Sequence, residues 1–288
     1  MPAKYQVPLL AALSLSAALL ACGLPLNAGT VPPPSGQNSN ETSIAPTETV
    51  QPIQIASATD QSASGGTPVS FAGTSFSLPA VLASNAATQF ATDFEGGIMT
   101  SDGVNPKHIK ILLNDYALSG VGDAYVVVFL ASDFASIGSQ ETIDDLASLP
   151  ASVGPNLPIL KGLPFYARAQ IISFQNGRGL RLLTQNLQSQ APIDNAELYY
   201  SFRGLTSDGK YYVAASFPVK ADFLQANGNA DTTPPAGGIA FPSTFDMTEF
   251  EKYIGQVQQK MDDANPASFT PDLAAMDTLI QSIKVVAP

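Results

Sequence analysis

The sequence is poor in the residues on which many catalytic and metal sites depend, with one cysteine, one histidine and no tryptophan among its 288 residues. A single cysteine allows no intramolecular disulfide, so the fold has to be stabilised by its apolar core. Zinc sites built on cysteines or several histidines are excluded by the same counts, and we expect neither a metal nor another cofactor. A Ser-His-Asp arrangement would need the lone His108, and no G-x-S-x-G motif is present to partner it.

Basic residues are also scarce, since 13 lysines and arginines stand against 24 aspartates and glutamates and the formal net charge is −11. An acidic chain is repelled by nucleic acid backbones and by anionic lipid headgroups. We therefore expect neither of these as a partner.

Paired carboxylates occur at 144–145, 249–251 and 262–263, and glycoside hydrolysis or calcium binding would use such pairs. Each pair lies in or beside a predicted helix, where residues one or two apart do not face each other. We interpret them as solvated helix faces. An S-x-x-K match at 207–210 lies in a predicted hairpin turn, where its serine and lysine would not meet as they do on a helix.

The one long apolar run, Val7–Ala21, follows a short start that contains Lys4 and no acid. The run is shorter than the roughly 20 residues that a membrane-spanning helix needs. Its length and order are typical of an export signal.

The end of this run resembles the lipobox of bacterial lipoproteins. The residues concerned are Leu19, Leu20 and Ala21, followed by Cys22. The resemblance implies that residues 1–21 are a cleaved signal peptide and that Cys22 carries a diacylglyceryl group and a further acyl chain. Two or more buried chains give a stable anchor. We therefore expect the protein on the extracytoplasmic face of a bacterial membrane, inner or outer, with an ordinary signal peptide as the alternative.

Residues 22–67 are dense in Pro, Ser, Thr, Gly, Asn and Gln, and from residue 24 on they contain no Lys, Arg or aromatic residue. Such a segment buries too little apolar surface to offset its ordering entropy, so we expect a disordered tether. A flexible coil of this length has a root-mean-square span of about 35–40 Å.

The composition becomes that of a globular domain over residues 68–288. The segments 69–78, 107–118 and 124–131 are typical of strands, the first as a hairpin around Ala72–Gly73. Two further hairpins are expected around Asn176–Gly177 and Asp208–Gly209. The Asn-Gly pair favours a type I′ turn because both central residues take positive φ.

Three helices are expected in the same domain. The first is predicted at 139–149 with Ser139 as its N-cap, and the second begins with a capping box formed by Thr248 and Glu251. The third begins at Thr270–Pro271 and runs into a short strand at 284–286. The fold class is therefore α+β, with an antiparallel sheet built from hairpins and covered by two or three amphipathic helices.

The ending "FTPDLAAMDTLIQSIKVV" and the opening "VSFAGTSFSLP" resemble the PsbP/Mog1-like fold, whose members include accessory factors of larger complexes. The segments "FQNGRGLRLLTQ" and "ELYYSFRGLTSDGKYYVAASFPV" resemble an uncharacterised family of bacterial lipoproteins. The second resemblance implies no particular activity.

One set of side chains in the two hairpins is a candidate binding surface. Its members are Arg178, Arg181, Arg203, Tyr199, Tyr211 and Tyr212. Arginine and tyrosine are enriched in binding surfaces, and we expect these six to share one face of the sheet. Ordinary strand packing with the arginine tips reaching solvent is the alternative.

These features favour a membrane-anchored, extracytoplasmic, non-catalytic binding or accessory module with a protein or small-molecule partner. A carboxylate-dependent hydrolase and a structural protein of the cell envelope are the alternatives.

Overall fold

The computed structural model describes residues 54–55, 66–91, 106–154, 157–160, 162–243 and 246–287. They belong to one unit, Thr49–Pro288. The strands are β1 (Gln54–Ile55), β2 (Thr67–Phe71), β3 (Thr74–Leu78), β4 (Asn85–Ala91), β5 (His108–Asn114), β6 (Tyr125–Leu130), β7 (Tyr166–Phe174), β8 (Gly177–Thr184), β9 (Tyr199–Thr206), β10 (Tyr211–Pro218), β11 (Lys220–Ala221), β12 (Phe269–Thr270) and β13 (Lys284–Val285). The helices are α1 (Asp133–Ser136), α2 (Gln140–Ala147), α3 (Met247–Asp263) and α4 (Leu273–Ser282), with 3₁₀ turns η1 (Pro158–Leu160) and η2 (Pro266–Ser268).

Eight strands form the main sheet in the order β1-β4-β5-β6-β10-β9-β8-β7. Every neighbouring pair is antiparallel. A smaller sheet, β13-β3-β2, lies beside it, and the predicted strand at the C-terminal end is its member β13. The expected α+β class with an antiparallel sheet is confirmed.

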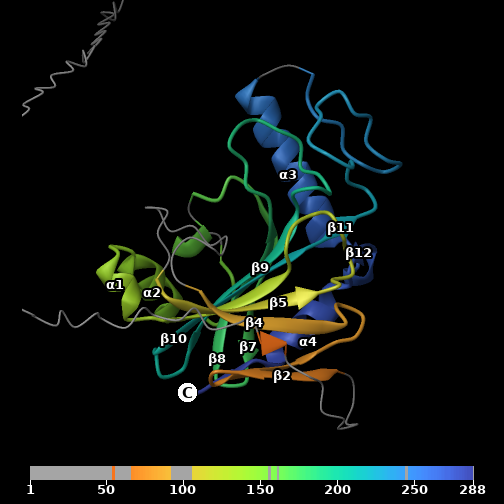
Figure 1. Ribbon diagram of the computed structural model, residues 1–288. Helices are drawn as coiled ribbons and strands as arrows, with labels where there is room; N and C mark the ends of the chain where they lie inside the picture. Colours follow the sequence, from red (N-terminus) through yellow and green to blue (C-terminus); the bar gives the residue numbers. More distant parts are fainter. Residues whose placement is uncertain are drawn as a thin grey trace, which may run out of the picture. The chain divides into compact units, whose positions relative to one another are not determined.

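Helices cover both faces of the main sheet (Figure 1). On one face, α3 and α4 bury Tyr253, Val257, Met276 and their neighbours in a larger core with the small sheet. On the other face, α1, α2 and η1 close a second core around Phe129 and Leu146. Because side chains alternate between faces, β6, β8, β9 and β10 contribute to both cores.

The two long hairpins are confirmed, but the turn of the first differs from the prediction. β7 and β8 are joined by Gln175 and Asn176, and neither has a positive φ, so the turn is not the type I′ turn centred on Asn176–Gly177. The Asn176 side chain instead accepts from the Val285 amide at 3.1 Å, which ties the turn to β13. In the second hairpin Gly209 has φ +70°, as an Asp-Gly turn predicts.

Helix ends also differ from the expected ones. The N-cap of α3 is Asp246, whose carboxylate accepts from the amides of Thr248 and Glu249, so the capping box of Thr248 and Glu251 is wrong. Asp246 lies two residues before Thr248, and its carboxylate already accepts the hydrogen bonds of the first free amides of the helix, so the helix begins two residues earlier than a Thr248 cap would allow. Helix α4 likewise begins after Asp272, two residues beyond the predicted Thr270–Pro271 start.

The remaining caps and strands show where periodicity was a weak guide. Ser139 precedes α2 as expected, but its hydroxyl makes no cap hydrogen bond. Strand β4 was not predicted, since its sequence NAATQFA is rich in alanine, a poor strand former. The expectation of disorder over residues 22–67 is wrong at two places, because Gln54–Ile55 pairs with β4 and Thr67 begins β2.

Candidate functional site

The strand register divides the six predicted binding residues between the two faces of the main sheet. Arg181 lies opposite Phe202, whereas Arg203, one residue further along β9, lies opposite Leu180. Since neighbouring residues of a strand point to opposite faces, Arg181 and Arg203 cannot share one. The α3–α4 face holds Arg181 and Tyr211, and the α1–α2 face holds Arg178, Tyr199, Arg203 and Tyr212. The expectation of a single surface is therefore wrong.

Arg181 is buried in an ion pair with Asp277 of α4. Its Nε lies 3.0 Å from Oδ1 and its Nη2 lies 2.8 Å from Oδ2, which is a two-point pairing. The same guanidinium donates to the Arg168 carbonyl at 2.7 Å and to Gln170 Oε1 at 2.9 Å. The Tyr200 hydroxyl donates to Asp277 at 2.8 Å. These bonds join β7, β8, β9 and α4, so Arg181 has a structural role.

Three further members of the set also serve the fold. Tyr212 is fully buried and packs its ring against Phe129 and Phe134, with centroids 5.5 and 5.1 Å away. Arg178 is exposed and donates to the Leu149 carbonyl beyond α2. Tyr211 is half-buried at the lower end of β10.

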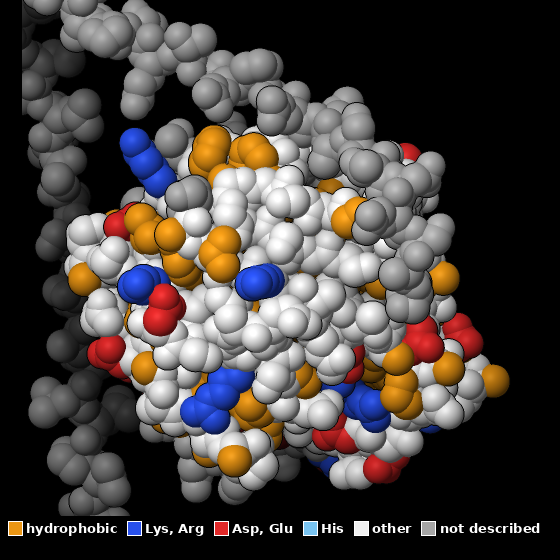
Figure 2. All heavy atoms as spheres, turned by 90° about the horizontal axis from the view of Figure 1, so that it is seen from below, with side chains coloured by type: hydrophobic (Ala, Val, Ile, Leu, Met, Phe, Trp, Pro, Cys, Tyr) orange, Lys and Arg blue, Asp and Glu red, His pale blue; other side chains and the backbone are white. Residues whose placement is uncertain are grey.

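The end of the sheet at which β10 begins, where Tyr211 lies, carries several exposed apolar side chains, including Phe90 and Leu130. Phe90 packs against Phe71 with ring centroids 5.0 Å apart. Seen from below, hydrophobic side chains on this face are interspersed with charged ones and form no single broad area (Figure 2). Scattered apolar residues are normal on a protein surface.

Two surface depressions lie along β7, the last strand of the main sheet. A depression of about 530 Å³ opens beside its upper half, lined by Val153, Gly154, Tyr166, Ala167, Arg168, Ala169, Gln170, Arg181, Gln258 and Asp262. A second depression of about 460 Å³ lies beside its lower half, lined by residues 170–175 and Gln281.

A bulge shapes the first depression. The β7–β8 register shifts between Ala167 and Gln170, and Arg168 there takes φ +56°. Such a conformation is unfavourable for arginine and needs support from its surroundings. Asp262 supplies it, since its carboxylate accepts from the Arg168 amide and its carbonyl accepts from the guanidinium at 2.9 Å. Helix α3 thus fixes one wall of the depression.

The outer edge of β7 is unpaired. In the described part of the chain β7 pairs only with β8, and the Gln175 amide beyond its end donates to the Ile283 carbonyl at 2.9 Å. Opposite residues alternate between hydrogen-bonded and non-hydrogen-bonded pairs. Because the two-residue turn closes on the Phe174–Gly177 pair, Ile171 and Ser173 direct their N–H and C=O groups outward.

His108 is buried and packs against Phe129, with ring centroids 4.8 Å apart. Its Nδ1 lies 2.9 Å from the Pro106 carbonyl and so carries the proton. Burial, opposed by that bond and aided by Lys110, lowers the pKa of His108 below 6.5. Within the described residues Nε2 has no partner, so no serine completes a catalytic pair there.

The paired carboxylates are separate as well. Residues 144–145 lie on α2 and the other two pairs on α3, and they are largely exposed. Among the described residues, no group of three or more His, Cys, Asp or Glu side chains is placed to hold a metal ion.

Some features of this surface gave no sequence signal. The Arg168–Asp262 contact spans 94 positions of the chain, and nothing in the pattern around Arg168 predicts a bulge. The sequence does carry a weak signal for the buried pair, because Asp277 is a lone acid within the apolar stretch LAAMDTLI.

The predicted lipobox, Leu19, Leu20, Ala21 and Cys22, lies outside the described residues. No helix among the residues that are described has the length and apolar character needed to cross a bilayer. No known protein family matches the sequence, and no curated protein shows significant similarity to it.

Proposed function

We propose that this protein is a lipid-anchored, extracytoplasmic, non-catalytic binding module that holds a partner protein by pairing with an extended segment of it. The lipobox at Cys22 and the Pro/Ser/Thr-rich segment after it support the anchor and the tether. The observation that carries the binding role is the free edge of β7.

The edge has the properties that strand addition requires. Ile171 and Ser173 present unpaired backbone groups two residues apart, about 6.4–6.8 Å along the strand, which is a ready template for another strand. The sequence AQIISF contains no charge and no proline, the devices that commonly protect an edge from pairing. In strand addition, main-chain hydrogen bonds give affinity and adjacent hollows select side chains.

The two depressions supply such hollows. The upper one presents Gln170, Gln258 and the Arg168 guanidinium, which suit a partner side chain with carbonyl or carboxylate oxygens. The lower one presents Ser173 and Gln281 beside apolar Ile172.

The same lining favours binding over hydrolysis. Asp262 is the one carboxylate that lines the upper depression, and it is already engaged by Arg168. A glycosidase uses two opposed carboxylates, and none of the lining residues is a serine, cysteine or histidine.

The anchor is tested by metabolic fatty-acid labelling of the wild type and of Cys22→Ala. We expect the label and the membrane association to disappear together in Cys22→Ala. A variant that stays labelled or membrane-bound would contradict the lipobox assignment.

The docking edge is tested with Ser173→Pro, with Ser173→Thr as its matched control. Proline removes the outward N–H and leaves the bonds to β8 intact, and proline is tolerated on edge strands in this orientation. In cross-linking pull-downs from cells, we expect specific partners with the wild type and Ser173→Thr and their loss with Ser173→Pro, at a nearly unchanged melting temperature. Equal recovery of partners by all three would rule out docking at β7.

A further inference from the structure

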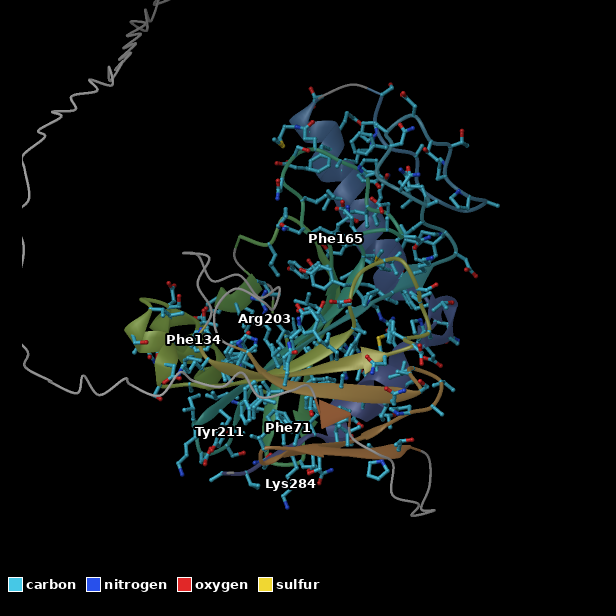
Figure 3. The ribbon with its side chains drawn as sticks, in the orientation of Figure 1. Phe71, Phe134, Phe165, Arg203, Tyr211 and Lys284 are labelled. Atoms are coloured by element: carbon cyan, nitrogen blue, oxygen red, sulfur yellow. The ribbon has the colours of Figure 1, made fainter. Side chains whose placement is uncertain are left out.

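Arg203 differs from every other arginine of the chain. The other three, Arg168, Arg178 and Arg181, each donate to a carbonyl or carboxylate oxygen. Arg203 is half-buried on β9, and among the described residues it has no hydrogen-bond or ion-pair partner. In Figure 3 it lies toward Phe134 of α1, away from Tyr211 and Lys284 at the lower edge.

The strands around Arg203 offer no counter-ion. None of β6, β8, β9 and β10 contains an aspartate or glutamate. Its direct neighbours across the ladders are Leu180 and Ala214. Removing a charge from water without a partner is unfavourable, so a half-buried arginine that has no counter-ion gains from an anion that joins it from outside.

Hydroxyl-bearing residues lie on the same face of the sheet as Arg203. Ser201, two residues from Arg203 on the same face, is opposite Ser216, which in turn is opposite Tyr125. Tyr125 is hydrogen-bonded to Ser216, and Arg203 acts electrostatically on both Tyr125 and Tyr199.

These hydroxyls are donors at neutral pH. Burial raises the pKa of Tyr125 to about 12, and it raises the pKa of Tyr199 against the opposing effect of Arg203. The patch therefore combines one fixed positive charge with several neutral O–H donors. That combination matches the oxygens of a carboxylate or a phosphate.

The space beside Arg203 limits the size of what enters. The narrow pocket that it lines with Ser201, Leu180 and Leu182 holds only about 10 Å³, roughly the room for one water molecule, so it admits a single oxygen atom of an anion. We infer that Arg203 and its neighbouring hydroxyls bind an oxoanion that places one oxygen in this pocket, while its other atoms and the rest of the ligand stay in solvent. This site lies on the α1–α2 face and is independent of docking at β7.

The test uses the arginine Nε–Hε signals of the ¹⁵N-labelled full-length chain in NMR spectra, of which the sequence allows four. Sodium phosphate and sodium acetate are titrated separately at constant ionic strength, with chloride as the balancing anion. We expect a saturable shift of the Arg203 signal, assigned by its loss in Arg203→Lys, and no shift of the buried Arg181 signal. A stronger response to phosphate indicates a phosphate-bearing ligand, and a stronger response to acetate indicates a carboxylate.

Variants separate binding from packing. Arg203→Gln is expected to weaken the thermal stabilisation by the preferred anion at least about tenfold in apparent affinity, since hydrogen bonds to charged groups are lost, while its own melting temperature is unchanged or raised. Arg178→Gln, which removes an exposed arginine from the same face, is the control and is expected to keep the response. An Arg203 signal that stays still, or that shifts equally when sodium chloride is added alone in a separate titration, would overturn the inference, as would a response that survives in Arg203→Gln.

Discussion

Arg181 and Arg203 show how the position of one acid decides the role of an arginine. Asp277 of α4 reaches Arg181 on one face of the sheet and closes a buried pair with it. The other face is covered by α1 and α2, and no acid of the described residues pairs with Arg203 there. The same side chain is therefore structural at one position and free for a ligand at the other.

At the residue scale, we predict that Asp277→Asn lowers the free energy of unfolding by about 3 kcal/mol, because the buried guanidinium of Arg181 loses its counter-ion. Urea denaturation followed by far-UV circular dichroism measures this. The double variant Arg181→Met with Asp277→Leu should lose clearly less free energy of unfolding than the sum of the losses in Arg181→Met alone and in Asp277→Leu alone. Additive costs would mean that the pair contributes no coupling.

His108 should make stability depend on pH. The unfolded chain takes up a proton near the ordinary pKa of 6.5, whereas burial lowers the folded-state pKa below it. The contribution of His108 to stability is therefore constant above about pH 7 and falls as the pH drops below 6.5. We expect His108→Phe to reduce the loss between pH 7.5 and 5.5, by at most about 1.4 kcal/mol. Equal losses in urea titrations of both proteins would contradict the assignment.

The sequence could identify these residues as candidates but not their surroundings. The lone histidine predicted at most one base, and its contact with Phe129 depends on the pairing of β5 with β6. Arg181 and Asp277 are 96 positions apart, and no local pattern reports that contact.

At the element scale, α3 offers a direct choice between two caps. The structure assigns the cap to Asp246, so Asp246→Ala should lower the free energy of unfolding by about 1 kcal/mol. Thr248→Ala is the matched control and should change it by a few tenths at most. The midpoints of urea denaturation compare the two, and a larger effect of Thr248→Ala would restore the capping box that the sequence favoured.

Elements whose pattern is set locally were predictable from the sequence. Both long hairpins and the stripes of α3 and α4 follow from alternation and from helical spacing. Strand β4 was missed because its alanines carry little strand preference, and it is held in place by pairing with β5. The bulge at Arg168 depends on Asp262 of a distant helix, so no local signal exists for it.

For the whole molecule, the shared strands couple the two cores. Val127 belongs to one core and Val128 to the other, on the same strand β6. We predict that Leu146→Ala, which empties part of the smaller core, lowers stability by about 2–4 kcal/mol and leaves a single unfolding transition. Calorimetry and circular dichroism should give coincident midpoints, and two separate transitions would show that the cores unfold independently.

The two edges of the main sheet also differ in how they would bear a mechanical load. With the chain anchored at Cys22 as proposed and a partner held at β7, tension would run across the ladders from β7 to β1. Among the described residues, β1 is joined to β4 by two residue pairs, the shortest pairing in the sheet. Under tension, β1 would separate from β4 before any other strand pair. The chain released in this way would lengthen the connection to the membrane and lower the force on the remaining strands.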